Sequence, residues 1–325
     1  SAQGQHNMVT ILQESQNLTA IAYTVITQRD GYTNSEILQK ILDGNDTKTR
    51  YYKISQNDLY EGEELYIRLN KNKVTKILSN ISGKSKPLKR FCDVYKGIET
   101  GKNTVFVFND LPAFYRRLTK EERSLIVPFY KNSDIVHYHH KKNTKYLLYF
   151  PNGIVIENFP NISEYLKSHK KELLTRAHIK RSSRPWYTLL WPRDPKLFLP
   201  GPKIVTSYRP KINSFCYIED LFYSGTDTYY IVNPKKYSLK FIVGILNSKL
   251  SLIWLKNKGK IKGNIIEMTG DTIEQILIPR IETTTNRNRH EIELLVDKIL
   301  TITKDDDYLT NPEKQTKVKE LEKQI

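Results

Sequence analysis

Four clusters in this sequence bring basic side chains together with aromatic residues or glycines. They lie at residues 95–103, 181–193, 208–211 and 256–264. Arginine can bind a guanine edge or a phosphate through two hydrogen bonds, and tryptophan and tyrosine offer planes on which bases stack. Lysines in a glycine-containing loop suit phosphate contact, which sets affinity and salt dependence but carries no sequence information. Together the clusters predict a nucleic-acid-binding surface.

Each cluster also has a structural interpretation. Trp186 and Trp191 would more often pack in a core than stack on a base. A lysine-rich loop is usually only solvated, and Gly97 and Gly101 would then serve turns. The predicted contact residues are nevertheless Lys96, Thr100, Lys102, Asn103, Arg181, Arg184, Trp186, Tyr187, Arg193, Tyr208, Arg209, Lys211, Lys258, Lys260 and Lys262.

The overall charge favours the nucleic-acid interpretation. Lys and Arg number 52 against 35 Asp and Glu, which gives a formal net charge of +17. Such a surplus repels itself in a compact fold unless a polyanion binds, and nucleic acid explains it better than an anionic membrane surface does. The 21 tyrosines agree with this, although an AT-rich genome would also enrich Lys, Asn, Ile and Tyr.

No catalytic or metal-binding arrangement stands out in the sequence. Residues 97–103 resemble a phosphate-binding loop, but one residue is missing between the two glycines and Asn103 replaces the magnesium-binding Ser or Thr. His137, His139 and His140 follow Asp134, yet no downstream Cys or His pair completes a familiar metal spacing. Neither the carboxylates of a metal-dependent nuclease nor a nucleophile elbow is present. We therefore predict no catalytic residue and no metal site in this chain.

The cysteines and the hydropathy pattern indicate a cytoplasmic protein. Cys92 and Cys216 stand far apart, which argues against a disulfide framework and fits a reducing compartment. No apolar run approaches the roughly 18 residues that a membrane helix needs. No signal peptide opens the chain, and we expect no membrane partner.

Strands and helices alternate irregularly along the sequence. Strands are predicted at residues 8–12, 20–26, 104–108, 145–150, 203–208, 214–218, 228–232 and 276–279. Helices are predicted at residues 35–42, from Thr119, from Asn161, along 239–254 and in the charged tail 288–325. The predicted fold is mixed α/β (α+β), with a twisted sheet, flanking helices and a charged helical C-terminal tail.

The order of these features resembles a known family. Residues 88–103, with the sequence Gly97-Ile98-Glu99-Thr100-Gly101, resemble the opening of target-recognition domains in TaqI-like and type IIG restriction–modification enzymes. Those domains typically open with a Gly-Ile-x-Thr-Gly turn followed by a strand. Residues 202–217, Leu246-Asn247-Ser248-Lys249-Leu250 before a basic glycine loop, and Ile276-Leu277-Ile278-Pro279 resemble the family in the same order. The resemblance covers most of residues 88–325.

The resemblance implies a domain that faces the major groove of double-stranded DNA while a separate methyltransferase domain flips and methylates an adenine. The complete enzyme would use S-adenosylmethionine and would often also cleave DNA. This sequence lacks the family's Asn-Pro-Pro-Tyr motif and its glycine-rich cofactor site, so we expect neither activity, and no cofactor, in this chain. Its expected partners are double-stranded DNA and the enzyme's own methyltransferase domain.

On this interpretation the basic residues divide between two roles. We expect base or near-base contacts from Lys102, Arg181, Arg184 and Arg209. We expect phosphate contacts from Lys258, Lys260 and Lys262.

The predicted domain organisation has three parts. Residues 1–86 would be the end of the methyltransferase domain plus a connector, residues 87–282 the DNA target-recognition domain, and residues 283–325 a helical C-terminal segment. One alternative is a type I specificity subunit, although such a subunit usually carries two recognition domains and only one is visible here. Another is a protein-interaction module that docks a partner subunit through residues 288–325.

Overall fold

The computed structural model describes residues 20–27, 34–56, 59–61, 66–67, 78, 80–143, 145–262, 264–280 and 286–325. The chain divides into two compact units, Ser1–Asn80 and Ile81–Ile325, and each is described by itself. The strand predicted at residues 8–12 lies outside the described residues. The domain boundaries predicted after residues 86 and 282 stay predictions.

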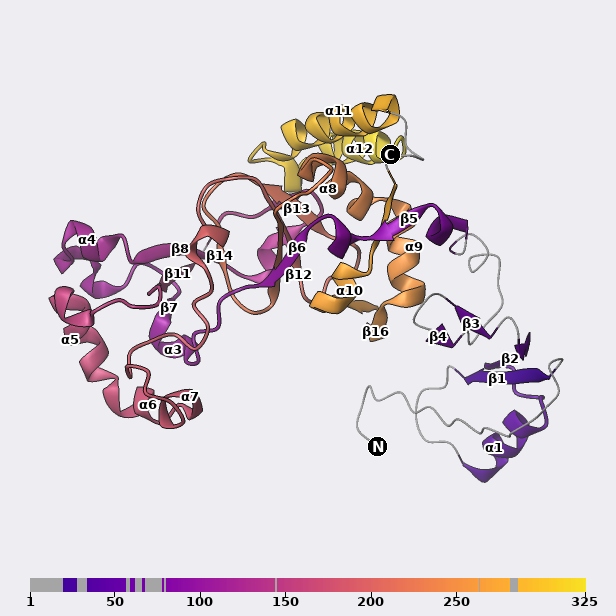
Figure 1. Cartoon of the computed structure of the whole chain (residues 1–325), viewed down its shortest axis with the longest axis horizontal. Coiled ribbons are helices and arrows are strands. Elements are labelled where there is room, and N and C mark those ends of the chain that lie inside the picture. Colours follow the sequence, from indigo (N-terminus) through magenta and orange to yellow (C-terminus); the bar gives the residue numbers. More distant parts are fainter. Residues whose placement is uncertain are drawn as a thin grey trace. The chain divides into compact units, whose positions relative to one another are not determined.

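The first unit is built on a two-stranded antiparallel ribbon (Figure 1). Its elements are β1 (Ile21–Thr27), α1 (Ser35–Leu42), β2 (Thr49–Ser55), β3 (Tyr60–Glu61) and β4 (Tyr66–Ile67). The helix α1 begins at Asn34, whose side-chain oxygen accepts a hydrogen bond from the Ile37 N–H at 2.8 Å. This cap satisfies one of the backbone donors that every helix leaves free at its start.

The second unit contains two four-stranded sheets. The first sheet has the order β14 (Tyr223–Ser224), β8 (Ile126–Tyr130), β11 (Lys145–Leu148) and β7 (Val107–Phe108). The second sheet has the order β13 (Phe215–Ile218), β12 (Lys203–Ser207), β15 (Thr228–Val232) and β6 (Asp93–Lys96). Neighbouring strands are antiparallel except β14 and β8, which are parallel.

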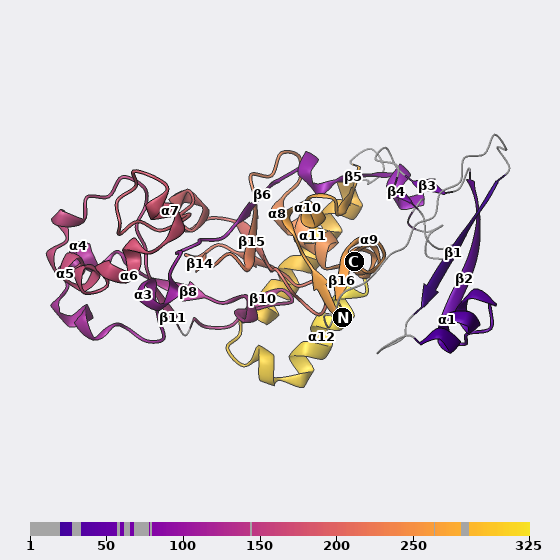
Figure 2. The same cartoon turned by 90° about the horizontal axis from the view of Figure 1, so that it is seen from below.

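Besides these sheets, the described part of this unit contains three two-stranded ribbons and two groups of α-helices. The ribbons pair β5 (Ser85–Pro87) with β18 (Leu277–Pro279), β9 (Ile135–Val136) with β10 (His139–His140), and β16 (Lys260–Lys262) with β17 (Ile265–Glu267). Around the first sheet lie α3 (Asn103–Phe106), α4 (Lys120–Arg123), α5 (Pro160–Ser168), α6 (Lys170–Leu174) and α7 (Ala177–Lys180) (Figures 1 and 2). Around the second lie α8 (Leu239–Asn247), α9 (Lys249–Lys258), α10 (Gly270–Glu274), α11 (Asn286–Thr303) and α12 (Pro312–Glu322).

The second sheet separates two hydrophobic cores. Ile204, Tyr229 and Ile231 pack into the core formed with α8 and α11. Their neighbours Val205 and Tyr230 pack into the other core, which the first sheet and α5 complete. Successive residues of a strand point to opposite faces, so β12 and β15 are buried on both sides and join the two halves of the unit.

The mixed α/β fold class is confirmed, with corrections to individual elements. Of the strand expected at residues 104–108, only Val107–Phe108 forms one (β7), and Asn103–Phe106 is the short helix α3. This helix buries the neighbouring side chains of Val105 and Phe106 in the same core. In a strand, two successive side chains would point to opposite faces of the sheet. Residues 256–258 and 260–262 do not form the expected loop: α9 extends to Lys258, and Lys260–Lys262 forms β16. Within the described part of the chain, every helix is too short or too polar to span a membrane.

Candidate nucleic-acid interface

The turn at residues 97–101 is built by a close approach of two backbone segments. The Gly97 N–H donates to the Thr228 carbonyl and the Ile98 N–H to the Ser224 carbonyl, both at 2.9 Å. A Cβ atom on Gly97 would lie 2.2 Å from the Gly225 carbonyl oxygen. Glycine is therefore required at position 97 because the turn crosses the chain's own backbone.

Thr100 serves the turn and is only 3% exposed. Its side chain is buried, and its hydroxyl donates to Asn103 Oδ1 at 2.6 Å. The same hydroxyl accepts the Lys102 N–H at 3.1 Å. The sequence predicted that Thr100 contacts DNA, and in the structure its hydroxyl orients the Asn103 amide. Lys102 is partly exposed and pairs with Glu172 at 3.3 Å.

A buried arginine that the sequence analysis missed holds this turn to the next segment. The Arg176 guanidinium donates to the carbonyls of Thr100 at 3.1 Å, Thr188 at 2.9 Å and Trp186 at 2.6 Å. Its Nε donates to the Leu173 carbonyl at 3.1 Å. Burial lowers the pKa of Arg176 to about 10. No sequence signal distinguishes this arginine, because its partners are backbone groups.

Trp191 presents an exposed indole between two arginines. Its side chain is 50% exposed, and the guanidinium carbons of Arg184 and Arg193 each lie 5.7 Å from its ring centre. Arg184 also donates to the Leu190 carbonyl at 2.8 Å, and Arg193 to the Gly97 carbonyl at 3.1 Å. These hydrogen bonds fix both cations beside the ring. The core position predicted for Trp191 is therefore wrong.

The other residues of this segment divide between surface and core. Tyr187 is buried and its hydroxyl donates to the Ile154 carbonyl at 3.0 Å, so it is no stacking plane, contrary to the prediction. Trp186 is partly buried, with the Lys170 ammonium 5.4 Å from its ring centre. Arg181 is exposed at the C-terminal end of α7.

A second basic group surrounds one buried carboxylate. The Tyr208 hydroxyl donates to Glu267 at 2.7 Å, and the nitrogens of Lys260, Lys262 and Arg209 lie 3.0, 3.4 and 3.6 Å from its oxygens. The Tyr208 hydrogen bond and the two ammonium groups lower the pKa of Glu267 to about 2. Glu267 is 3% exposed, whereas its cationic partners are about half exposed. The carboxylate thus holds Arg209, Lys260 and Lys262 together with their outer sides in solvent.

The remaining predicted residues are exposed basic side chains near these groups. Lys96 ends β6, Lys211 follows Arg209 in the turn after β12, and Lys258 ends α9. His137, His139 and His140 are partly buried, and the His137 ring pairs with Glu322 of α12. Among the residues that the structure describes, no group of His, Cys, Asp or Glu has the arrangement of a metal site.

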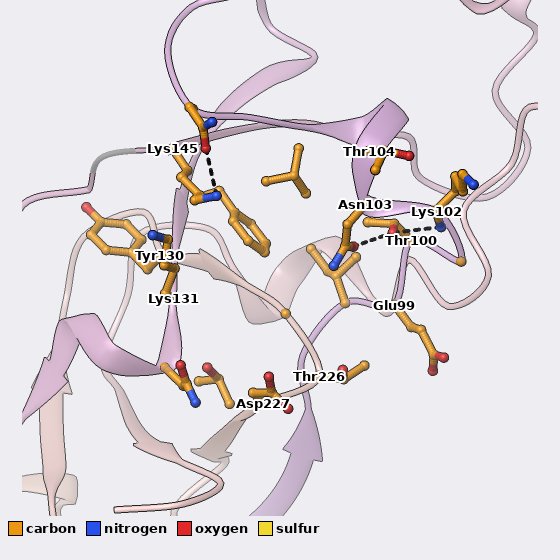
Figure 3. Close-up of a pocket in the computed structure, with 18 residues that line it drawn as sticks. Glu99, Thr100, Lys102, Asn103, Thr104, Tyr130, Lys131, Lys145, Thr226 and Asp227 are labelled. Atoms are coloured by element: carbon orange, nitrogen blue, oxygen red, sulfur yellow. Dashed lines mark hydrogen bonds between the residues drawn. The ribbon is translucent and has the colours of Figure 1, made fainter. Parts of the chain in front are cut away.

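An open pocket of about 930 Å³ lies between the 97–104 segment and the 225–228 turn (Figure 3). Its polar lining includes Lys102, Asn103, Lys131, Lys145 and Asp227. Lys145 donates to Asn109, another residue of the pocket wall, at 2.8 Å. The pocket therefore offers mainly hydrogen-bond donors, together with the acidic groups of Glu99 and Asp227.

Backbone hydrogen bonds connect the pocket to the arginines around Trp191 and to the cations around Glu267. The backbones of Glu99 and Trp191 exchange two hydrogen bonds, of 3.0 and 2.8 Å. On the other side, the Tyr208 N–H donates to the Asp227 carbonyl at 2.8 Å. These contacts connect residues from all four sequence clusters, including Lys260 and Lys262 of the lysine cluster, into one group that we call the basic track. It comprises Lys102, Asn103, Arg184, Trp191, Arg193, Tyr208, Arg209, Asp227, Lys260 and Lys262.

Comparison with known proteins identifies the class of this chain. A family model for the C-terminal domain of the type II methyltransferase M.Eco57I matches residues 64–309. The class is therefore that of restriction–modification proteins, as the sequence resemblance had indicated. Within it, the chain belongs to the M.Eco57I C-terminal domain family.

Individual relatives agree with this family. The chain is 25% identical over 202 residues to the type II methyltransferase M.HindII of Haemophilus influenzae, covering 59% of this chain and 38% of the relative. It is 26% identical over 138 residues to M.HincII of the same organism, covering 39% and 27%. The type IIL restriction–modification enzyme MmeI, solved in complex with DNA, has the same fold with a TM-score of 0.58 at 14% identity, covering 85% of this chain and 36% of that one. The chain spans less than two-fifths of the length of each of these proteins.

Proposed function

We propose that this chain recognises sequence in double-stranded DNA as the specificity domain of a restriction–modification methyltransferase. The observation that carries the proposal is the basic track, because it joins cations from distant parts of the sequence into one surface. Protein–DNA interfaces combine phosphate contacts, which position the duplex, with base contacts, which specify sequence. The track offers side chains for both roles.

The geometry suggests which side chains take each role. Lys260 and Lys262 are 65% and 45% exposed beside Glu267 and suit backbone phosphates. Arg184 and Arg209 have planar guanidinium groups that can bind a guanine edge. Trp191 between its two arginines provides an exposed plane for stacking or for contact with a thymine methyl group.

We infer that methyl transfer belongs to a part of the protein outside this chain. The relatives are more than twice as long as the segment they share with it. The sequence carries neither an Asn-Pro-Pro-Tyr motif nor a glycine-rich S-adenosylmethionine site. The cofactor, and any cleavage of DNA, would therefore be associated with that other part, and a methyltransferase domain is the expected second partner.

Selection from random duplex DNA across a salt series tests the proposal. We expect an enriched motif and a steep decrease of affinity with salt. Lys260→Ala should make the negative slope of log affinity against log salt shallower by about one unit without changing the motif. Lys317→Ala is the matched control, because this exposed lysine lies on α12, far from β16 in Figure 1, and its loss should leave the slope unchanged. Absence of binding even at low salt would contradict the proposal.

A further inference from the structure

One carboxylate in the basic track has no internal role. Asp227 lies in the turn between β14 and β15, is exposed, and lines the pocket (Figure 3). In the described part of the chain, no side chain donates a hydrogen bond to this carboxylate or forms an ion pair with it. Its backbone carbonyl is fixed by the Tyr208 N–H at 2.8 Å. The position of the turn is thus determined while the side chain stays available.

A free carboxylate restricts what can enter the pocket. Phosphate oxygens are repelled by it, so a DNA backbone alone would be bound better without Asp227. The groups of DNA that an aspartate can bind are hydrogen-bond donors, and in the major groove these are the exocyclic amino groups, most directly N4 of cytosine.

The opposite wall of the pocket supplies oriented donors. Because Thr100 donates to Asn103 Oδ1 at 2.6 Å, the Asn103 amide has a fixed orientation and its Nδ2 group turns into the pocket (Figure 3). Lys102 follows the same turn, but its ammonium already pairs with Glu172 at 3.3 Å. The Asn103 amide donor matches the acceptors O6 and N7 of guanine, which lie beside cytosine N4 on the major-groove edge of a base pair.

We propose that the pocket reads one cytosine–guanine pair, with the Asp227 carboxylate accepting from cytosine N4 and the Asn103 amide donating to the guanine edge. This inference rests on the proposed DNA recognition and identifies the feature that this pocket selects. Asp227 then lowers affinity for DNA in general and raises affinity for one base pair. A carboxylate that only stabilised the fold would not have these opposite effects.

Selection with Asp227→Asn, which keeps the shape of the side chain, tests the assignment. We expect the variant to lose discrimination at one cytosine–guanine position, on the order of 10- to 100-fold, while the other positions stay as in the wild type. Its affinity for unrelated duplex should rise, because a negative charge is removed. Asp110→Ala, which removes an exposed carboxylate outside the pocket, is the control and should change neither quantity. Thermal melting checks that both variants fold.

The possible results separate the inference from the proposed function. An enriched motif that Asp227→Asn leaves unchanged at every position would overturn the assignment of the pocket and leave DNA recognition intact. Wild-type binding without any enriched motif would overturn the pocket assignment and the proposed sequence recognition together, because the chain would then bind DNA without selecting a sequence. Complete absence of DNA binding would overturn the proposed function and the pocket assignment together.

Discussion

Replacement of Arg176 by methionine should destabilise the second unit and weaken the basic track without removing any ligand contact. Arg176 directly precedes α7, is 7% exposed, and donates four hydrogen bonds to backbone carbonyls. One of those carbonyls belongs to Thr100, in the segment that carries Lys102. Another belongs to Trp186, in the segment that carries Trp191. Methionine fills a similar volume and donates none of these hydrogen bonds.

The expected magnitude follows from two opposing contributions. Hydrogen bonds from a charged group contribute about 1.5–3 kcal/mol each, so the set favours the folded state by roughly 6–12 kcal/mol. Against this stands the burial of a guanidinium without a carboxylate partner, which costs several kcal/mol. We therefore expect Arg176→Met to lower the free energy of unfolding by about 3 kcal/mol. For a unit of this size that corresponds to a decrease in Tm of roughly 6–12 °C.

Thermal and urea denaturation measure this change, and DNA binding separates positioning from contact. The matched control for stability is Arg181→Met at the other end of α7, where the arginine is exposed. It should change the free energy of unfolding by no more than about 0.5 kcal/mol. Arg176→Met should lower affinity for every duplex while the salt slope stays constant, because no phosphate contact is removed. Equal melting temperatures of the two variants would refute the reasoning.

Three further predictions concern the backbone turn, the buried carboxylate and the helix starts. Gly97→Ala should lower the free energy of unfolding, measured by denaturation, by at least about 2 kcal/mol because its Cβ would clash with Gly225. Gly83→Ala has open space around the new Cβ and should leave the free energy of unfolding unchanged. Glu267 has a folded-state pKa of about 2 against an ordinary 4.5, so its contribution to stability is complete above pH 4.5 and disappears as the pH falls to 2. The stability difference between wild type and Glu267→Gln should shrink over that range, and a constant difference would contradict the assignment. Glu122→Ala should lower the free energy of unfolding by about 2–4 kcal/mol and so lower Tm. The reason is that this buried carboxylate accepts hydrogen bonds from backbone N–H groups at the starts of α4 and α5.

The sequence predicted the elements whose pattern is local. Lys203–Ser207 and Thr228–Val232 are short runs rich in β-branched and aromatic residues, and both are strands of the second sheet. Thr119 and Glu122 form the expected capping box at the start of α4. These predictions succeed because the relevant interactions lie within a few residues.

Features that depend on burial could not be predicted in this way. Thr104 and Val105 favour a strand by propensity, yet packing of Val105 and Phe106 into the same core makes the segment helical. Arg176 and Tyr187 resemble the surface residues around them in the sequence, and only their carbonyl partners show that they are structural. The clusters could be recognised in the sequence as groups of basic residues, but their connection depends on backbone contacts between distant segments, such as the one between residues 208 and 227.

Glu267 shows how a chain with a net charge of +17 can keep its cations ordered before any ligand arrives. Three cationic groups on neighbouring turns would repel one another and spread if no anion lay between them. The buried carboxylate compensates part of that repulsion and fixes Lys260, Lys262 and Arg209 by its ion pairs, yet leaves a surplus of positive charge at the surface. A DNA phosphate that contacts their exposed sides would therefore meet cations whose side-chain entropy has already been reduced, which favours binding. Glu267 is buried, so it would oppose a bound phosphate less than an exposed acid such as Asp227 would. If the chain recognises DNA as proposed, this difference would separate a phosphate-binding group from a base-reading one.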